Sequence, residues 1–503
     1  MNTNFFSPKV SVVRNEKIDG YPDDAPFNPS SQYAEYPWGK GPISEKPNRV
    51  YEMVRESFYL LGMDHENYGK KTWNPLSEIV KPSDKVVIKP NAVLHYNADK
   101  TQSVFASITH SSVLRPIIDF VIIALQGKGQ IIIADCPMMN SNFKTWKSIM
   151  QLEKILDFYK GKTQVALSVL DLRETTTKWI IGFTPALYRK KVNLDPLGYT
   201  VVDLGEKSQL QSFNQSQIEN AYGADYRVNE TIEYHSNNRH AYKVSNTILD
   251  SDVLISVPKL KVHKKVGVTL NIKGMVGIIG DKNSIIHSRR GSLSTGGDEY
   301  PPDLSFLQKK FNEAKMFLIT KVLAKYNIFY DLIYLLLEIP RRLAEKILIK
   351  GSETNRKYLG GSWSGNDSAW RMGPDLLNIA IYGRINQNVV GNIPRRFFSV
   401  IDGILGGEDD GPLSPTVKNS GVIISGFNPV AVDWVSAQLM NFDPEKLKIL
   451  NNSKSQKGLT WQGEKNPVIN SNEKQIIDLW DNNFNLDFLP PLGWRGQVER
   501  IKK

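Results

Sequence analysis

The stretch that decides the fold is residues 85–135, which contains KVVIKP (85–90), SSVLRPIIDFVIIALQ (111–126) and QIIIAD (130–135). The first and last of these segments are short apolar runs, which are typical of strands buried on both faces of a sheet. Ser111 or Ser112 can cap the helix between them. A strand, a helix and a second strand in this order predict a parallel pair joined by a helical crossover.

Further strands and helices alternate along the chain. We expect helices at 49–60 and 143–159, and strands at DVLISVPKLKVH (252–263), FFSVID (397–402) and GVIISG (421–426). The last strand leads into Asn428-Pro429, a favourable N-cap and first-turn pair for a helix ending at Leu439. Apolar strands that alternate with helices predict an α/β fold, in which a mostly parallel sheet is covered by helices.

The length of the chain, 503 residues, exceeds the size at which a single core stops growing. Residues 1–50 are rich in Pro, Asn, Ser and Tyr, and we expect an extended N-terminal arm there. Residues 51–305 and 361–450 are predicted to form the α/β core. We expect 306–360 to be a large helical insertion and 451–503 a C-terminal extension.

Cys136 is the single cysteine, so this chain cannot supply the thiolates of an iron–sulfur cluster or of a multi-cysteine zinc site. No basic region followed by an apolar run marks a secretory signal, and no uninterrupted apolar stretch is long enough to span a membrane. We therefore expect a cytoplasmic protein, with peripheral contact at the inner membrane face. An excess of 63 Lys and Arg over 52 Asp and Glu gives a net charge of +11, which favours anionic partners.

The segment 309–350 carries nine basic and four acidic residues and thus supplies +5 of that charge. Its apolar part, residues 316–339, includes four charged side chains, which argues against a transmembrane helix. Aromatic residues and the flanking Arg341 and Arg342 fit a helix lying on an anionic membrane surface. A helix that packs on this protein or on a protein partner is the alternative.

Polar residues gather where the predicted strands end, and sheets of this kind bind ligands beyond the carboxyl ends of their strands. The residues at these ends are Lys89, Asn91, His95, Thr109, His110, Asp135, Lys259, Lys261, His263 and Asp402. The sequence therefore predicts one polar, cation-rich crevice that suits an anionic ligand.

The run VPKLKVHKK (257–265) contains the densest group of cations in the core. If it is extended, Lys259, Lys261 and His263 lie on one face of the strand. Like charges side by side repel each other, so the arrangement favours a bound phosphate or carboxylate, or nearby carboxylates. The alternative is a solvated edge strand whose lysines prevent aggregation.

Roles follow from the chemistry of each side chain. His110 or His263 would move a proton, while Asp135 and Asp402 would orient reacting groups. The residues expected to bind the anion are Lys89, Asn91, Lys259, Lys261, Asn271, Lys273 and Arg371. Arg371 belongs to GSWSGNDSAWR (361–371), which fits a sugar or nucleobase site and also fits a capped helix with buried tryptophans.

A divalent metal, Mg²⁺ or Mn²⁺, is a further hypothesis, with Asp135, Asp402, Glu408 and Asp409 as ligands. The run GGEDDGP (406–412) suits a metal-binding loop and equally an ordinary turn. Histidines that bond to backbone or to carboxylates are the alternative to a metal site.

Several motifs together resemble one family. VVIKPN, THSSVLRPIID, IIIADCP, VPKLKVHKKVGVTLNIKGMVG, IDGILGGEDDGP and NPVAVD are similar to the domain of unknown function 362 family, in the family's order, over about residues 80–440. GSWSGNDSAWRMGPDLLNI (361–379) and LPPLGWRG (489–496) resemble a longer subgroup. The resemblance implies an α/β fold and no established activity.

The same resemblance implies which positions belong to the family's motifs. They are Lys89, Asn91, His110, Asp135, Lys259, Lys261, His263, Asn271, Lys273, Asp402 and Asp433. Some members of the family append iron–sulfur ferredoxin modules, and this chain, with its one cysteine, has no such module.

Three hypotheses of function follow. The first is an enzyme that acts on an anionic small molecule or a glycan- or lipid-linked precursor, by transfer or ligation rather than redox chemistry. The second is a non-catalytic protein that binds an anionic ligand in the same crevice. The third is a nucleic-acid-binding protein, which the net charge suggests but for which no recognised reader motif occurs.

Overall fold

A computed structural model describes residues 6–501 except 40–42, 178–189, 226, 303, 318–335, 337–359, 386–393, 457 and 462–464. Its centre is one large sheet with the strand order β16-β1-β15-β14-β10-β2-β3-β4, which β11 and β12 extend beside β14. The strands are β1 (Lys9–Arg14), β2 (Lys85–Pro90), β3 (Gln130–Asp135), β4 (Ala166–Asp171), β10 (Val253–Val257), β11 (Lys259–His263), β12 (Gly267–Val268), β14 (Arg396–Asp410), β15 (Ser414–Gly426) and β16 (Val468–Ser471).

Strands β14, β10, β2, β3 and β4 run parallel to one another. β15 is antiparallel to both of its neighbours, β14 and β1. The chain therefore has an α/β fold with a mostly parallel sheet, as the sequence predicts.

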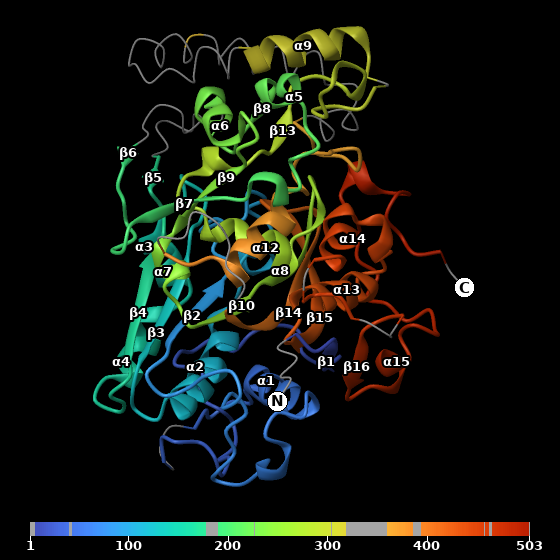
Figure 1. Ribbon diagram of the computed structural model, residues 1–503. Helices are drawn as coiled ribbons and strands as arrows, with labels where there is room; N and C mark the ends of the chain where they lie inside the picture. Colours follow the sequence, from blue (N-terminus) through green and yellow to red (C-terminus); the bar gives the residue numbers. More distant parts are fainter. Residues whose placement is uncertain are drawn as a thin grey trace.

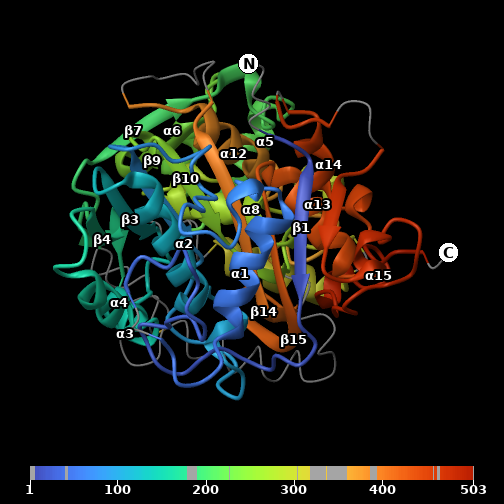
Figure 2. The ribbon, with the colours of Figure 1, turned by 90° about the horizontal axis from the view of Figure 1, so that it is seen from below.

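Helices cover both faces of this sheet. α1 (Arg49–Leu60) and α2 (Ser111–Leu125) lie on one face, and α8 (Leu270–Gly274), α12 (Met372–Tyr382) and α13 (Pro429–Leu439) lie on the other (Figures 1 and 2). Side chains along each strand alternate between two cores: Ile131 and Ile133 pack with α1 and α2, whereas Ile132 packs with the second group. This alternation follows from the two-residue period of a strand.

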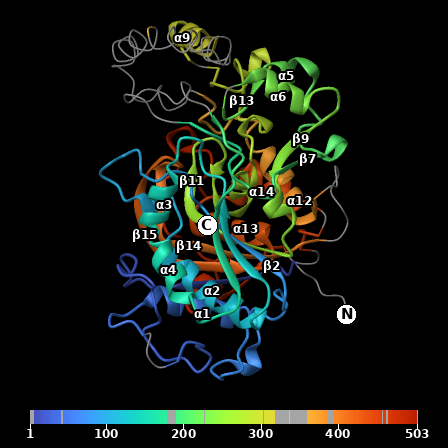
Figure 3. The same cartoon turned by 90° about the vertical axis from the view of Figure 1, so that its left-hand side faces the viewer.

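The structure describes further helices and strands. The other helices are α3 (Phe143–Ile149), α4 (Leu152–Tyr159), α5 (Gln215–Glu219), α6 (Val228–His235), α7 (Asn246–Leu249), α9 (Phe306–Phe317), α14 (Lys448–Lys454) and α15 (Lys474–Ile477). Three two-stranded sheets pair β5 (Thr175–Thr176) with β6 (Lys190–Lys191), β7 (Tyr199–Asp203) with β9 (Ala241–Ser245), and β8 (Ala221–Tyr222) with β13 (Ser288–Arg289). α5, α6, β13 and α9 gather at one end of the molecule, beyond the central sheet (Figure 3).

Several predicted elements match the structure closely: α1, β2, β3 and α13 have the expected bounds, and the side chain of Asn428 caps α13. The cap of α2 was predicted wrongly. It is His110, whose Nδ1 accepts from the N–H of Ser112 at 3.1 Å. An imidazole nitrogen can accept this bond as a hydroxyl would.

Two predicted elements are divided. The helix expected at 143–159 is interrupted between α3 and α4, where Gln151 has a left-handed φ of 49°. The strand expected at 252–263 is divided at Pro258, which has no N–H to donate, into β10 and β11. β11 pairs with the distal half of β14, at Asp402 and Gly407.

The prediction of a loop or turn at GGEDDGP (406–412) is wrong for residues 406–410. These residues continue β14, which pairs with β15 as far as Asp410. Glycine permits this packing. A Cβ on Gly407 would lie 2.3 Å from the carbonyl oxygen of Ala106.

The N-terminal and C-terminal segments both supply strands. β1 lies inside the sheet, between β15 and β16, so the segment expected to be an arm contributes to the core. Of the predicted basic insertion, the structure describes α9, and most of 309–350, including Arg341 and Arg342, lies outside the described residues. Among the described residues, no helix is long and apolar enough to cross a membrane.

Candidate functional site

The predicted site residues fall into two groups, and the first is a closed network around Asp402. Lys259 Nζ donates to Asp402 Oδ2 at 3.0 Å, and both side chains are fully buried. The hydroxyl of Tyr21 donates to Asp402 Oδ1 at 2.7 Å and accepts a bond from Lys259. The N–H of His110 donates to Asp402 Oδ2 at 2.9 Å. Lys259 and Asp402 therefore satisfy each other within the protein.

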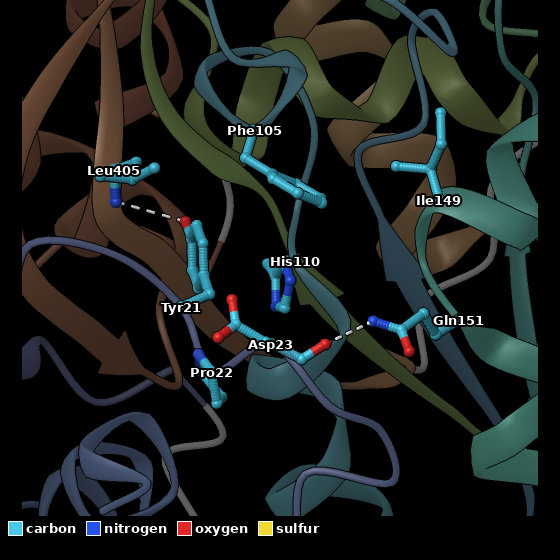
Figure 4. A pocket seen from close by; sticks show the side chains of 8 residues that line it. All are labelled: Tyr21, Pro22, Asp23, Phe105, His110, Ile149, Gln151 and Leu405. Carbon is cyan, nitrogen blue, oxygen red and sulfur yellow. Dashed lines mark hydrogen bonds between the residues drawn. The ribbon is translucent and has the colours of Figure 1, made fainter.

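His110 lies beside this network, at a pocket of about 250 Å³. Its ring stacks on Tyr21 with 4.1 Å between the ring centroids, and Phe105, Ile149 and Gln151 form other walls (Figure 4). Burial and the charge of Lys259 lower the pKa of His110 well below its usual value. His110 is thus a neutral ring whose Nδ1 is engaged with Ser112.

Lys89 and Asp135 form a second buried ion pair, with 2.7 Å between Lys89 Nζ and Asp135 Oδ1. The other oxygen of Asp135 accepts from the N–H of Ala92 at 2.8 Å. Gly277 closes over the pair, because a Cβ at this position would lie 1.9 Å from Asp135 Oδ1. Only glycine allows the backbone to approach so closely.

The side chains of the predicted asparagines bond to other groups of the protein. Asn91 Oδ1 accepts from the N–H of Lys259 at 3.2 Å. Asn271 donates from Nδ2 to Asp433 Oδ1 at 2.8 Å, and Asp433 also accepts the N–H groups of Asn271 and Ile272. Asp433 therefore fixes the start of α8, whose last turn carries Lys273.

The second group is a cluster of cations on β11, on α8 and in the loops that follow them. We call it the cation cluster, and its members are Lys89, Lys261, Lys265, Lys273, Lys282, His263 and His287. Lys261 is fully buried, Lys273 is 6% exposed, and Lys265 and His287 are partly exposed. The alternative of a solvated edge strand at β11 is therefore wrong.

Electrostatics show that these cations lie close together. Burial, followed by the charges of Lys259 and Lys273, lowers the pKa of Lys261 to about 7. Burial, followed by Lys282, Lys265 and Lys89, lowers the pKa of Lys273 to about 7. Burial lowers the pKa of Lys265 to about 8. A buried lysine surrounded by other lysines loses stability in its charged form.

Burial and these lysines also lower the pKa values of His263 and His287 well below the usual value. Both rings are therefore neutral near pH 7. A neutral ring can accept a proton at one nitrogen and donate one from the other.

Carboxylates offset this charge only in part: Asp298 and Glu299 act on Lys265, and Asp135 acts on Lys261. Among the described residues, Asp135 forms an ion pair with Lys89, and none pairs with Lys261, Lys265, Lys273 or Lys282. Two buried hydroxyls close to Lys261, of Ser107 and Thr269, also have no hydrogen-bond partner. Buried polar groups are nearly always satisfied, so unpaired ones indicate a group that completes the site.

The four carboxylates expected to bind a metal have other partners. Asp135 and Asp402 pair with lysines, Glu408 accepts from the N–H of Leu489, and Asp409 accepts from Arg495. Within the described ranges, no group of three or more His, Cys, Asp or Glu could hold a metal ion.

Arg371 also has internal partners. Its guanidinium donates to the carbonyl oxygens of Gln209 and Asp367, and it stacks on Phe213 at 4.5 Å. Asn366 accepts the N–H groups of Ser368 and Ala369, so the turn before α12 is built from its own side chains. This arrangement favours the structural alternative for GSWSGNDSAWR.

A comparison with known families matched part of the chain. Residues 206–438 match the family model described as Domain of unknown function (DUF362). The chain carries a DUF362 domain. The domain contains β11, α8 and four lysines of the cation cluster, whereas Lys89 and Asp135 precede the matched range. A comparison with curated proteins found no match.

Sequence reasoning missed three members of the cluster: Lys265, Lys282 and His287. Lys265 belongs to the run VPKLKVHKK (257–265), which is the signal that could have located it. Lys282 Nζ donates to the carbonyl oxygens of Cys136, Val276 and Ile279, a role that no spacing rule reveals.

Proposed function

We propose that the cation cluster binds an anionic small molecule, and that the protein acts on it as an enzyme of transfer or ligation chemistry. The observation that carries the proposal is that Lys261, Lys273 and Lys282 are buried and form no ion pair with a carboxylate of the described residues. An unpaired buried charge is costly, and such groups are retained when they are paired in the working state. A phosphate or carboxylate group on the ligand would supply the missing charge.

The chemistry of the surrounding groups supports catalysis as well as binding. Lys261 and Lys265 would hold the anion and stabilise charge that develops on it. His263 would move a proton, since its ring is neutral and its charge state is coupled to Lys273. A glycan- or lipid-linked precursor with a phosphate group is one substrate class of this kind.

Thermal unfolding with added orthophosphate or pyrophosphate tests the binding. A ligand at 100 times its Kd should stabilise the protein by about 2.7 kcal/mol. Lys261→Ala should remove this stabilisation, and Lys128→Ala, at an exposed lysine, should not. Equal stabilisation of the wild type and Lys261→Ala would refute the proposed site.

Mass spectrometry of small molecules that co-purify with the protein then separates enzyme from carrier. Conversion of the co-purified anion by the wild type, lost in Lys261→Ala, supports an enzyme. Retention without conversion supports the non-catalytic alternative. Duplex DNA that binds Lys261→Ala and the wild type equally would favour a nucleic-acid partner on another surface.

We also propose a peripheral position at an anionic membrane, through α9. Phe306, Leu307 and Phe317 are 72%, 73% and 63% exposed, and Lys309 and Lys310 lie between them in the sequence. Exposed apolar side chains beside lysines suit the headgroup region of an anionic bilayer. In flotation assays with phosphatidylserine vesicles, the wild type should float with the vesicles, and the double variant Phe306→Asp/Leu307→Asp should not. Equal flotation of both proteins would refute contact through α9.

A further inference from the structure

Lys273 differs from every other lysine of the cation cluster. Lys89 pairs with Asp135, Lys261 Nζ donates to the carbonyl oxygen of Ser107 at 2.5 Å, and Lys265 Nζ donates to Ser288 Oγ at 3.1 Å. Lys282 donates to three carbonyl oxygens. Within the described part of the chain, no group accepts a hydrogen bond from Lys273 Nζ.

The fold holds Lys273 in this position. The carboxylate of Asp433 receives the first N–H groups of α8, and the N–H of Lys273 itself donates to the carbonyl oxygen of Thr269 at 3.2 Å. The side chain is 6% exposed, so its amine is buried but not isolated from solvent. Among the described residues, the charges that act on it are those of Lys282, Lys265 and Lys89.

A lysine in this setting has a chemical use. Desolvation and neighbouring cations both favour the neutral amine, and only the neutral amine attacks carbonyl carbon. The lowered pKa of Lys273, about 7, agrees with this geometry. An ordinary exposed lysine is almost entirely protonated at pH 7 and is a poor nucleophile.

We propose that Lys273 is the nucleophile of the site and forms an imine with an oxo group of the anionic ligand. This inference rests on the proposed function, and it narrows the ligand to an oxo acid or a phosphorylated aldehyde or ketone. Lys261 and Lys265 hold the acid or phosphate group. The oxo carbon then faces the unpartnered amine of Lys273.

The step balances without any further reactant. The nitrogen lone pair of Lys273 forms a bond to the carbonyl carbon, and the C=O π electrons move to oxygen. Both protons of the Lys273 amine are passed to that oxygen, which leaves as water while the C=N bond forms. His263 and His287 can pass these protons, since both rings are neutral and sense the charge of Lys273.

Labelling with pyridoxal 5′-phosphate tests the inference, because this probe carries an aldehyde and a phosphate group. Borohydride reduces the imine to a stable adduct, and peptide mass spectrometry locates it. At pH 7 we expect Lys273 to be labelled at least about ten-fold more than exposed Lys128. Labelling should rise with pH around 7 and fall when orthophosphate competes. Pyridoxal, which lacks the phosphate, should react more weakly.

Lys273→Arg is the matched variant, since it keeps the charge and removes the nucleophile. It should lose labelling in that peptide and retain stabilisation by orthophosphate. Orthophosphate stabilisation without preferential labelling of Lys273 would overturn the imine inference and leave the proposed function intact. Preferential labelling that neither orthophosphate nor the probe's phosphate affects would instead overturn the anion site. The labelling is measured on the wild type, so the result does not depend on the variant folding.

Discussion

Replacing Lys273 with methionine should stabilise the protein, although a core lysine would be removed. Methionine has a similar length, carries no charge and adapts to irregular spaces. A pKa of about 7 in place of 10.5 corresponds to about 5 kcal/mol of lost stability for the charged form. We therefore expect Lys273→Met to be about 4 kcal/mol more stable than the wild type at pH 6.

The pH dependence of this gain has a definite sign. The unfolded chain keeps the proton on Lys273 up to about pH 10.5, whereas the folded chain keeps it only below about pH 7. Between these values unfolding takes up a proton, so the stability contributed by this residue rises with pH by about 1.4 kcal/mol per pH unit. The advantage of Lys273→Met should therefore be full below pH 7 and shrink as the pH approaches 10.5.

Urea unfolding of both proteins at pH 6, 8 and 9.5 measures this difference. Lys259→Met is the matched control, because it is the same substitution at a paired lysine. Burial also lowers the pKa of Lys259, but its removal leaves Asp402 buried without a counter-charge. That loss should cost about 3–5 kcal/mol. A destabilised Lys273→Met, or a gain that does not change with pH, would refute our account of the cation cluster.

Three further outcomes follow from the contacts. Gly277→Ala should destabilise the protein by about 1–3 kcal/mol in urea unfolding, because its Cβ would overlap Asp135, and a neutral effect would contradict that packing. Tyr21→Phe should lower the free energy of unfolding by about 1–3 kcal/mol, since the hydroxyl bridges Lys259 and Asp402. Limited proteolysis should then cut the N-terminal segment faster, and unchanged cleavage would show that Tyr21 does not anchor this segment. Mg²⁺ or Mn²⁺ should leave the melting temperature unchanged, because the candidate carboxylates bond to protein donors, and a clear rise would restore the metal hypothesis.

The sequence by itself determined the layered architecture. Apolar runs such as Val86–Ile88 and Ile131–Ala134 are stable only in strands that are buried on both faces of a sheet. The capping residues and prolines near such runs limit where helices begin. It also identified the cation-rich run on β11, because a period of two is a local property of the chain.

Only the tertiary structure decided which lysines have a carboxylate partner among the described residues. Lys259 and Lys273 look alike in sequence, yet Lys259 bonds to Asp402 and Tyr21 from distant segments. Among the described residues, the charges that act on Lys273 are those of other lysines. The strand nature of the glycine run in β14 likewise depends on a long-range partner, β15. Pairing, burial and charge balance depend on residues far apart in the chain, so local pattern cannot supply them.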